Sequence, residues 1–302
     1  MPGLSVLLPI YNRDVTQLVQ ALVQQAASWP GPVEILCLDD GSEESTRRLN
    51  RVVATWPKVH YLELPHNIGR SAIRNRLAAA ARYPWLLLLD NNISPPDKQF
   101  LARYATAISE AAVIVGGTVY TERAPANPEL RLRWLYGQRR EASPAAQRQQ
   151  QPRAPFILKN VLMQAEVFRQ FRLDETLTHY GHEDSKLGWQ LREAGITIHH
   201  IDNPALHDGL EPASAFLYKT QQAVCNLVYL YYSNGWGRDT GLLRAALMLR
   251  RMGLGQVYRA GFLLMSKRIQ RALLSAAPKL WHLDALKLYW ALQELRRQQR
   301  KK

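Results

Sequence analysis

Residues 82–100 read RYPWLLLLDNNISPPDKQF, and within them four leucines run directly into an acid and two amides. A continuous apolar run that ends in an acid is typical of a strand buried on both faces of a parallel sheet. We therefore predict a strand at residues 85–90, with Asp90, Asn91 and Asn92 at its carboxyl end. The packing of a hydrophobic core does not explain why polar side chains follow this strand.

Similar apolar runs and helical patterns alternate on both sides of this strand. The predicted strands are 5–10, 33–39, 59–64, 85–90 and 112–120. The predicted helices between them are 14–28, 43–55, 69–82 and 97–110. Alternation at this spacing is typical of βαβ units. The expected fold class is α/β, with a mostly parallel central sheet and flanking helices.

The second half of the chain departs from this alternation. Residues 122–155 are rich in Pro, Gln, Ala and Arg, and they predict a short helix near 129–136 and then a mobile loop. This loop acts either as a lid or as a solvated linker. Regular structure is expected again at 156–163, in a helix at 183–194, in a strand at 196–201 and in helices from residue 214.

The composition indicates a globular protein, since 47% of the 302 residues are hydrophobic and can bury a full core. Cys37 and Cys225 lie in apolar runs, so we predict free buried thiols and a reducing compartment. The start MPGLSVLLPIYNRD lacks the basic region and the cleavage site of a signal peptide, and none is expected. No uncharged apolar run reaches the ~18 residues of a membrane-spanning helix.

The positive charge is concentrated in a C-terminal tail. The chain has a net charge of +14, and residues 241–302 hold 14 Lys and Arg against Asp284 and Glu294, or +12 of that charge. Apolar residues recur there at helical spacing. Such a tail either lies on an anionic membrane surface or packs on the rest of the chain with a solvated basic face. Nucleic-acid binding is disfavoured, because no nucleic-acid-binding module accompanies the charge.

Acidic residues cluster where the predicted strands end, which is where open parallel sheets bind ligands. Asp39 and Asp40 follow the second strand, and Asp90 follows the fourth. Crowded carboxylates typically bind a cation or a polar ligand. The alternative is helix capping, but Ser42 and Ser94 are better placed to cap the following helices. A function in ligand binding is therefore favoured for Asp40 and Asp90.

Three further groups suit a polar ligand. In HNIGRSAIRNRLAAA (66–80), a helix start is followed by Arg70, Arg74 and Arg76, which suits a phosphate or simply a solvated helix. In YGHEDSKLGWQL (180–191), two acids open a helix, where the helix dipole favours carboxylates. His207 is predicted in a loop after a strand, and a histidine beside carboxylates can bind a metal.

Five segments, in this order, resemble the family-2 glycosyltransferases with the GT-A fold: SVLLPIYNR, LDDGS, HNIGRSAIRN, LLLLDNN and GHEDSKLGWQLREAG. The resemblance covers roughly residues 3–220, and its second part is most similar to bacterial members. It implies an inverting enzyme that moves a sugar from a nucleotide diphosphate sugar, with UDP or dTDP favoured, to a hydroxyl of a saccharide or lipid-linked acceptor. The implied role is cell-surface polysaccharide or glycoconjugate biosynthesis.

The resemblance also implies roles for single residues. Pro9 and Tyr11 would line the base pocket, Asp40 would hydrogen-bond the base, and Arg74 would contact the nucleotide. Asp90 would open the Asp-x-Asp motif, near the ribose and the metal.

On the acceptor side, Asp184 would be the general base, with Glu183 beside it. The divalent cation, Mn²⁺ or Mg²⁺, would be held by Asp90, Asn92 and His207. Asn92 stands where the family usually has Asp. Its carbonyl oxygen can bind the cation without contributing charge, so we expect weak metal binding. The alternative is a member that works with little metal.

The predicted domains are a catalytic domain at 1–213 and a basic helical region at 214–302. The first has a nucleotide-sugar half (1–120), the mobile loop (122–155) and an acceptor half (156–213). The expected location is cytoplasmic, with peripheral contact to the inner face of the cell membrane through residues 241–302. Nucleic acids are not expected as partners. Two other functions stay open: a sugar nucleotidyltransferase, and a non-catalytic nucleotide-sugar-binding or scaffold protein.

Overall fold

The computed structural model describes residues 2–151, 156–177 and 179–300, and these form two compact units. The first unit comprises Met1–Thr121, Arg140–Thr176 and Glu183–Gly209, and the second comprises Glu122–Arg139, Leu177–His182 and Leu210–Lys302. The chain passes for the last time from the first unit to the second at Leu210. Residues 152–155, the end of the predicted mobile loop, lie outside the described residues.

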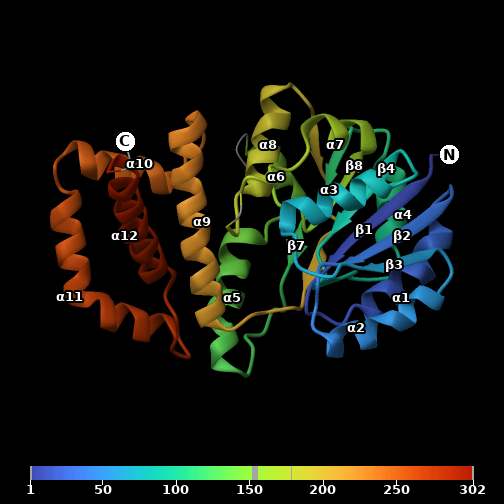
Figure 1. Cartoon of the computed structure of the whole chain (residues 1–302), viewed down its shortest axis with the longest axis horizontal. Coiled ribbons are helices and arrows are strands. Elements are labelled where there is room, and N and C mark those ends of the chain that lie inside the picture. Colours follow the sequence, from blue (N-terminus) through green and yellow to red (C-terminus); the bar gives the residue numbers. More distant parts are fainter. Residues whose placement is uncertain (1, 152–155, 178, 301–302) are drawn as a thin grey trace. The chain divides into compact units, whose positions relative to one another are not determined.

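A seven-stranded sheet forms the centre of the first unit (Figure 1). Its strands are β1 (Leu4–Ile10), β2 (Val33–Asp39), β3 (Val59–Glu63), β4 (Trp85–Leu89), β6 (Val113–Val115), β8 (Asn160–Gln164) and β9 (Ile198–His200). The order is β3–β2–β1–β4–β8–β6–β9, and among these described strands β8 alone runs antiparallel to its neighbours. The predicted α/β fold with a mostly parallel sheet is confirmed.

The leucine run of β4 is buried on both faces, as predicted. Leu87 and Leu89 belong to one hydrophobic cluster, and Leu86 and Leu88 belong to another, because successive side chains of a strand point to opposite faces. Helices α1 (Thr16–Gln25) and α4 (Phe100–Ala107) cover the first cluster; α3 (Arg70–Ala80), α7 (Ala165–Phe171) and α8 (Glu183–Glu193) cover the second. Each buried leucine contributes about 1.5–3 kcal/mol to stability.

A small second sheet interrupts the predicted strand at 112–120. This strand divides into β6 and β7 (Thr118–Val119), because Gly116 and Gly117 turn the chain between them. Gly117 has φ +90°, and a Cβ on Gly116 would lie 2.4 Å from the Tyr104 hydroxyl. Strand β10 (Ala205–His207) pairs with β7 and with β5 (Ile93–Ser94). The prediction that His207 lies in a loop is therefore wrong, because backbone pairing places it in a strand.

Neither predicted serine cap forms. The Ser42 hydroxyl accepts a hydrogen bond from the Asn12 amide (2.8 Å), and Asn12 Oδ1 in turn accepts from the amide of Glu43, just before α2 (Glu44–Asn50). Ser94 lies in β5, and α4 begins only at Phe100. The cap at Ser42 is replaced by a contact from the distant loop that holds Asn12, and the cap at Ser94 fails because the helix begins too far along the chain.

The segment predicted as a loop contains more regular structure than expected. The short helix is confirmed as α5 (Arg131–Tyr136), but a π-helical turn at Gly137–Glu141 and helix α6 (Ala145–Gln150) follow it. Arg148 anchors α6 to the first unit, where it donates to the carbonyls of Ile201 (2.8 Å) and Gly116 (3.2 Å). Strand β8 begins at Asn160, later than the predicted 156.

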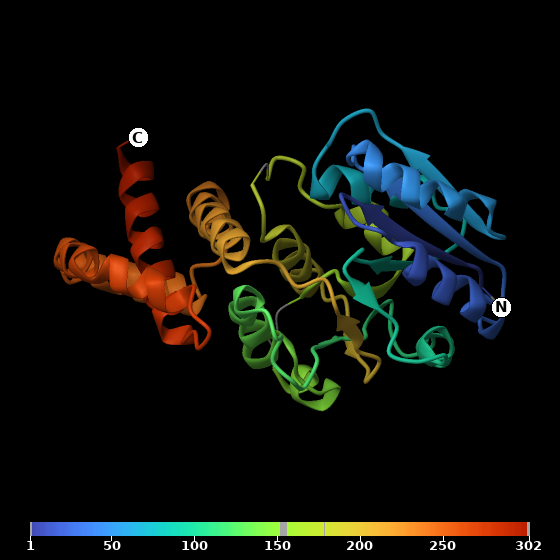
Figure 2. The ribbon, with the colours of Figure 1, turned by 90° about the horizontal axis from the view of Figure 1, so that it is seen from below.

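The C-terminal part of the second unit is helical, as predicted. It consists of α9 (Ala213–Asn234), α10 (Gly241–Arg251), α11 (Gly255–Leu273) and α12 (Leu280–Gln299). Helix α12 packs against α9, α10 and α11, around buried residues such as Val228, Leu243 and Leu292 (Figure 2). None of the described helices combines the length and the apolar character that crossing a membrane requires.

Candidate functional site

The candidate site lies at the carboxyl ends of β1, β2 and β4. The order of the strands reverses between β1 and β4, and open α/β sheets bind ligands at such a point. The two loops that leave β1 and β2 are joined, since the Asp40 amide donates to the carbonyl of Ile10 (2.8 Å). This edge therefore brings together polar residues from several loops.

Three of the predicted nucleotide-binding residues lie at the β1 and β2 end of this edge. Pro9 is part of β1, and Tyr11 follows it with half of its surface exposed. Asp40 is buried, and its Oδ1 accepts from the Ile68 amide (2.7 Å). Burial raises the pKa of Asp40, although this amide opposes the shift. The prediction that Asp40 lacks a structural role is wrong, because it supports the loop that leads into α3.

Asp90 is neutralised by arginines from α3. Arg74 Nη2 donates to Asp90 Oδ1, and both side chains are buried. Arg70 Nη2 lies 3.9 Å from Asp90 Oδ2. Burial opposes ionisation, but the charges of Arg74 and Arg70 outweigh it and hold the pKa of Asp90 below its ordinary value. The predicted partners Arg74 and Asp90 therefore form one buried ion pair.

Arg70 connects this pair to the acids of α8. Its Nε donates to Glu183 Oε1 at 2.7 Å, across 113 residues of sequence. Burial opposes ionisation of Glu183 too, but the charges of Arg70 and Arg74 outweigh it and lower its pKa. The sequence pattern indicated Arg70, with Arg74 and Arg76, as a group suited to a phosphate, and residues four apart share a helix face. It did not indicate that Arg70 pairs with Glu183.

Asp184 has the most altered acidity of the site. It follows Glu183 in the first turn of α8, is half-buried, and accepts a hydrogen bond from the Ser185 amide (2.7 Å). Burial and the negative charge of Glu183 raise the pKa of Asp184 to about 7. A carboxylate with such a pKa both accepts and releases a proton readily near neutral pH, which suits a general base.

The raised pKa of Asp184 predicts a pH-dependent cost to stability. The carboxyl ionises near its ordinary value of 3.8 in the unfolded chain and near 7 in the folded chain, so the folded state binds more protons between these values. Ionising Asp184 therefore costs stability as the pH rises from about 4 to about 7, at about 1.4 kcal/mol for each pH unit. We expect Asp184→Asn to resist urea better than the wild type at about pH 8 and to lose this advantage as the pH falls.

The control is Glu193→Gln, at an exposed position of the same helix. Its stability should follow that of the wild type at every pH. If the difference between Asp184→Asn and the wild type is independent of pH, the pKa of Asp184 is not raised.

The predicted metal ligands Asn92 and His207 lie near each other, Asn92 in the turn just before β5 and His207 in β10. His207 pairs in register with Ile93, next to Asn92, and the Gly209 amide donates to the Asn92 carbonyl (3.2 Å). His207 is buried, with its ring stacked on Tyr120 at 5.1 Å. Among the described residues, no group of three His, Cys, Asp or Glu side chains is placed to hold a metal ion.

One observation nevertheless fits a cation at this point. The Oδ1 of Asn92 is buried, and no hydrogen-bond donor in the described part of the chain reaches it. A buried amide oxygen without a donor is costly, and a hard cation would satisfy it. Asn92 therefore fits a cation, whereas the carboxylate of Asp90, two residues before it, is already paired with Arg74 and would have to share its charge with the metal.

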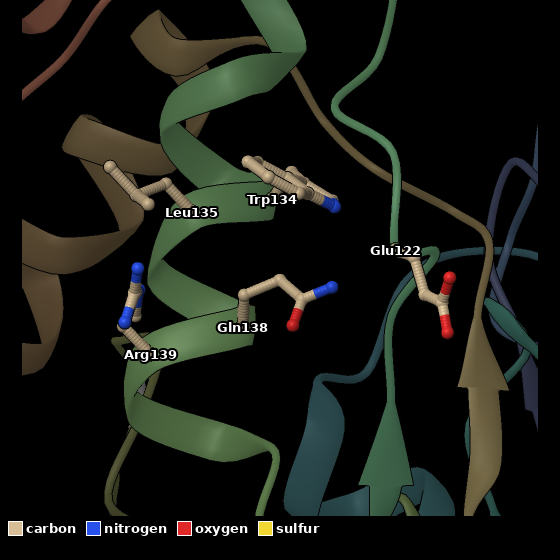
Figure 3. Close-up of a pocket in the computed structure, with 5 residues that line it drawn as sticks. All are labelled: Glu122, Trp134, Leu135, Gln138 and Arg139. Carbon is tan, nitrogen blue, oxygen red and sulfur yellow. The ribbon is translucent and has the colours of Figure 1, made fainter.

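The second unit contains a cavity of about 380 Å³ of its own. It is lined by Glu122, Trp134, Leu135, Gln138 and Arg139. Trp134 and Gln138 point from the helix toward Glu122, while Leu135 and Arg139 point to the other side (Figure 3). Gln138 and Arg139 lie on the π-helical turn, a deformation that is frequent at functional sites. The cavity thus combines an aromatic face with an amide and a carboxylate.

Comparisons with known proteins agree with this architecture. Residues 5–172, more than half of the chain, match the model of glycosyl transferase family 2. Validoxylamine A glucosyltransferase from Streptomyces hygroscopicus subsp. limoneus is 28% identical over 228 residues, which cover 66% of this chain and 49% of that protein. The chain therefore spans about half the length of this curated relative.

Solved structures share the fold. The mannosyltransferase PcManGT from Pyrobaculum calidifontis, in complex with GDP-Man and Mn²⁺, matches with a TM-score of 0.59 and 14% identity, over 97% of this chain and 87% of that chain. TarS from S. aureus, in complex with UDP, matches with a TM-score of 0.52 and 14% identity, over 99% and 92%. At this identity the likeness concerns the fold, and it confirms the predicted GT-A architecture.

Proposed function

Because the chain belongs to glycosyl transferase family 2, and is a glycosyltransferase, we propose that it transfers a sugar with inversion from a UDP- or dTDP-linked donor to a hydroxyl of a saccharide or lipid-linked acceptor. The observation that carries this proposal is the cluster of Arg70, Arg74, Asp90, Glu183 and Asp184 at the point where the strand order reverses. It combines cations for a diphosphate with a carboxyl whose pKa lies near 7.

In this mechanism the carboxylate of Asp184 removes the proton of the acceptor hydroxyl as its oxygen bonds to the anomeric carbon. The bond between that carbon and the diphosphate breaks at the same time, and the nucleoside diphosphate leaves with the electron pair. Arg70 and Arg74 stabilise the negative charge that develops on the diphosphate. Glu183 keeps Arg70 in position, and its charge keeps Asp184 basic. Pro9, Tyr11 and Asp40 form the pocket for the base.

Asp90, Asn92 and His207 would hold the divalent cation, which would neutralise charge on the leaving diphosphate when bound. PcManGT was solved with Mn²⁺, and this supports the use of a divalent cation. It does not identify which residues of this chain bind the cation. Since Asn92 adds no charge, the metal should bind weakly.

Replacing Asn92 by Asp tests the metal assignment. The added charge should strengthen Mn²⁺ binding by roughly tenfold or more, because affinity for hard cations rises with the number of charged ligands. Calorimetric titration of Mn²⁺ in the presence of UDP measures the effect without any turnover. The matched control is Asn91→Asp, which adds the same charge one residue away. Equal affinities in the two variants would remove Asn92 from the metal site.

Calorimetric titration with UDP, dTDP, GDP and CMP, each with and without Mn²⁺, tests the donor class. We expect a uridine or thymidine diphosphate to bind, and to bind more tightly with metal. Tight binding that is indifferent to Mn²⁺ would assign the chain to metal-independent members. Preference for GDP or CMP would overturn the proposed base. Absence of all nucleotide binding would contradict the proposed site itself.

We assign the cavity of the second unit to a saccharide acceptor. A sugar ring has an apolar face that packs on an aromatic side chain, and hydroxyls that pair with amides and carboxylates. Trp134, Gln138 and Glu122 offer this combination (Figure 3). The volume of about 380 Å³ falls in the range of small-molecule sites.

Trp134→Ala should weaken saccharide binding by roughly tenfold, through the lost aromatic face. Saturation-transfer NMR with a panel of hexoses and disaccharides measures this loss. The control is Trp281→Ala, at an exposed tryptophan elsewhere in the unit. If Trp134→Ala retains the saturation-transfer signals as fully as Trp281→Ala does, the cavity is not the site at which sugars bind.

The proposed location is the cytoplasm, with peripheral contact to the inner face of the cell membrane. The proposed biological role is bacterial cell-surface polysaccharide or glycoconjugate synthesis. Support for both comes from the basic tail and the family.

A further inference from the structure

Helix α11 is amphipathic, and only one of its sides is packed within the second unit. Phe262, Ile269 and Leu273 are buried toward α12, and the Phe262 ring stacks on Tyr289 with centroids 4.5 Å apart. Helix α12 in turn packs against α9, so α11 lies on the outer side of this helical layer (Figure 1). The residues of the opposite side of α11 are exposed to solvent.

This opposite side, called here the α11 outer face, consists of six exposed residues. They are Val257, Leu263, Leu264, Lys267, Arg268 and Arg271. At 3.6 residues per turn they share one side of the helix. The first three are apolar, and Leu264 is 90% exposed, so hydrophobic surface is presented directly to water. The last three are cationic and extend the same side toward the end of the helix.

The sequence around the α11 outer face is strongly basic. Residues 240–283 contain eight Lys and Arg and no Asp or Glu, and Asp239 and Asp284 flank this stretch. The preceding segment also exposes apolar side chains, with Met248 57% and Met252 60% exposed. Exposed apolar side chains together with cations indicate a binding partner that is apolar and anionic at once.

We propose that the α11 outer face binds a membrane leaflet that contains anionic phospholipids. The helix would lie in the plane of the interface, with Val257, Leu263 and Leu264 among the upper parts of the acyl chains. Lys267, Arg268 and Arg271 would meet the lipid phosphates, and their aliphatic stems would contribute apolar contact. This inference rests only on the location proposed above, and not on the transfer reaction.

Two other occupants fit the face less well. A second copy of the chain would oppose the three cations of the face to the same three cations, and like charges across an interface are costly. A nucleic acid would satisfy the cations but would leave Val257, Leu263 and Leu264 without apolar contact. Of the three, a membrane alone provides apolar contact for the three apolar residues and anionic groups for the three cations.

Vesicle co-sedimentation of the full chain tests the proposal. Vesicles of phosphatidylcholine with phosphatidylglycerol should bind the wild type at low salt, and vesicles of phosphatidylcholine alone should bind it much less. Lys267→Gln with Arg268→Gln and Arg271→Gln should weaken the partition by about fivefold per charge, roughly a hundredfold in total. Val257→Ser with Leu264→Ser should weaken it by at least about tenfold.

Each variant has a matched control. Arg48→Gln with Lys98→Gln and Arg169→Gln removes the same net charge from exposed positions of the first unit. Leu49→Ser with Leu62→Ser removes two other exposed leucines there. Both controls should bind anionic vesicles like the wild type. Unchanged thermal melting of every variant shows that folding is intact.

Three results would overturn the proposal. The first is a wild type that fails to bind anionic vesicles, and the second is binding of the α11 variants as tight as that of their controls. The third is a dimer in sedimentation velocity that the α11 variants abolish, which would assign the face to a second copy. Donor titration with UDP is independent of these outcomes, so a failure here leaves the glycosyltransferase proposal to its own experiment.

Discussion

Asp184→Asn should lower turnover by about 10²- to 10⁴-fold and leave nucleotide affinity unchanged within about twofold. The amide cannot take the proton of the acceptor hydroxyl, whereas the donor contacts assigned to Asp40 and Arg74 remain. Release of nucleoside diphosphate, measured with the donor that calorimetry identifies, gives the turnover. Titration of the same nucleotide into the variant gives the affinity.

Glu193→Gln, on the same helix, is the control for this experiment and should retain full turnover. The pH profile adds an independent criterion. In the wild type, turnover should fall as the pH drops below about 7, because Asp184 becomes protonated. A variant with normal turnover, or a wild type that is equally active well below this pH, would exclude Asp184 as the base.

Arg74→Met should destabilise the first unit by about 3–5 kcal/mol, because it leaves the charge of Asp90 buried without its principal partner. The arginine is 4% exposed and the acid is 6% exposed, so water does not replace the lost contact. Urea denaturation measures the loss. Arg76→Met, at an exposed position of the same helix, should change stability by at most about 0.5 kcal/mol.

A double variant separates the ion pair from the packing of the long side chain. Asp90→Asn with Arg74→Met removes both charges, and it should recover part of the stability that Arg74→Met loses. Additive losses in the two single variants would mean that the pair contributes no interaction energy. Unchanged stability of Arg74→Met would mean that Asp90 does not depend on this arginine.

The architecture was predictable because its signals are local. The leucine run at 85–90 is uniformly apolar, which requires a strand covered on both faces, and β4 satisfies this with a cluster on each side. The alternation of strands and helices then fixed the class of the sheet. The division of the strand at 112–120 also has a local cause, since two adjacent glycines interrupt it, but this signal was not used.

The site was predictable only in part, because its contacts are not local. Arg70 meets Glu183 across 113 residues, and nothing in either segment alone indicates the other. The cap at Ser42 failed for the same reason, since Asn12 reaches the start of α2 from a loop 31 residues away. His207 was placed in a loop because a strand of three residues is too short to show a periodic pattern.

Arg70 also couples two equilibria that are usually considered separately. Its guanidinium balances the charges of Asp90 and Glu183, and it lowers the proton affinity of Asp184 as well. A diphosphate that draws Arg70 toward itself would leave these acids less compensated, and their proton affinity would rise. Donor binding would then be accompanied by proton uptake, and reciprocally the affinity for the donor would depend on pH. The same arginine would thus make the cellular pH a determinant of how much enzyme carries its donor.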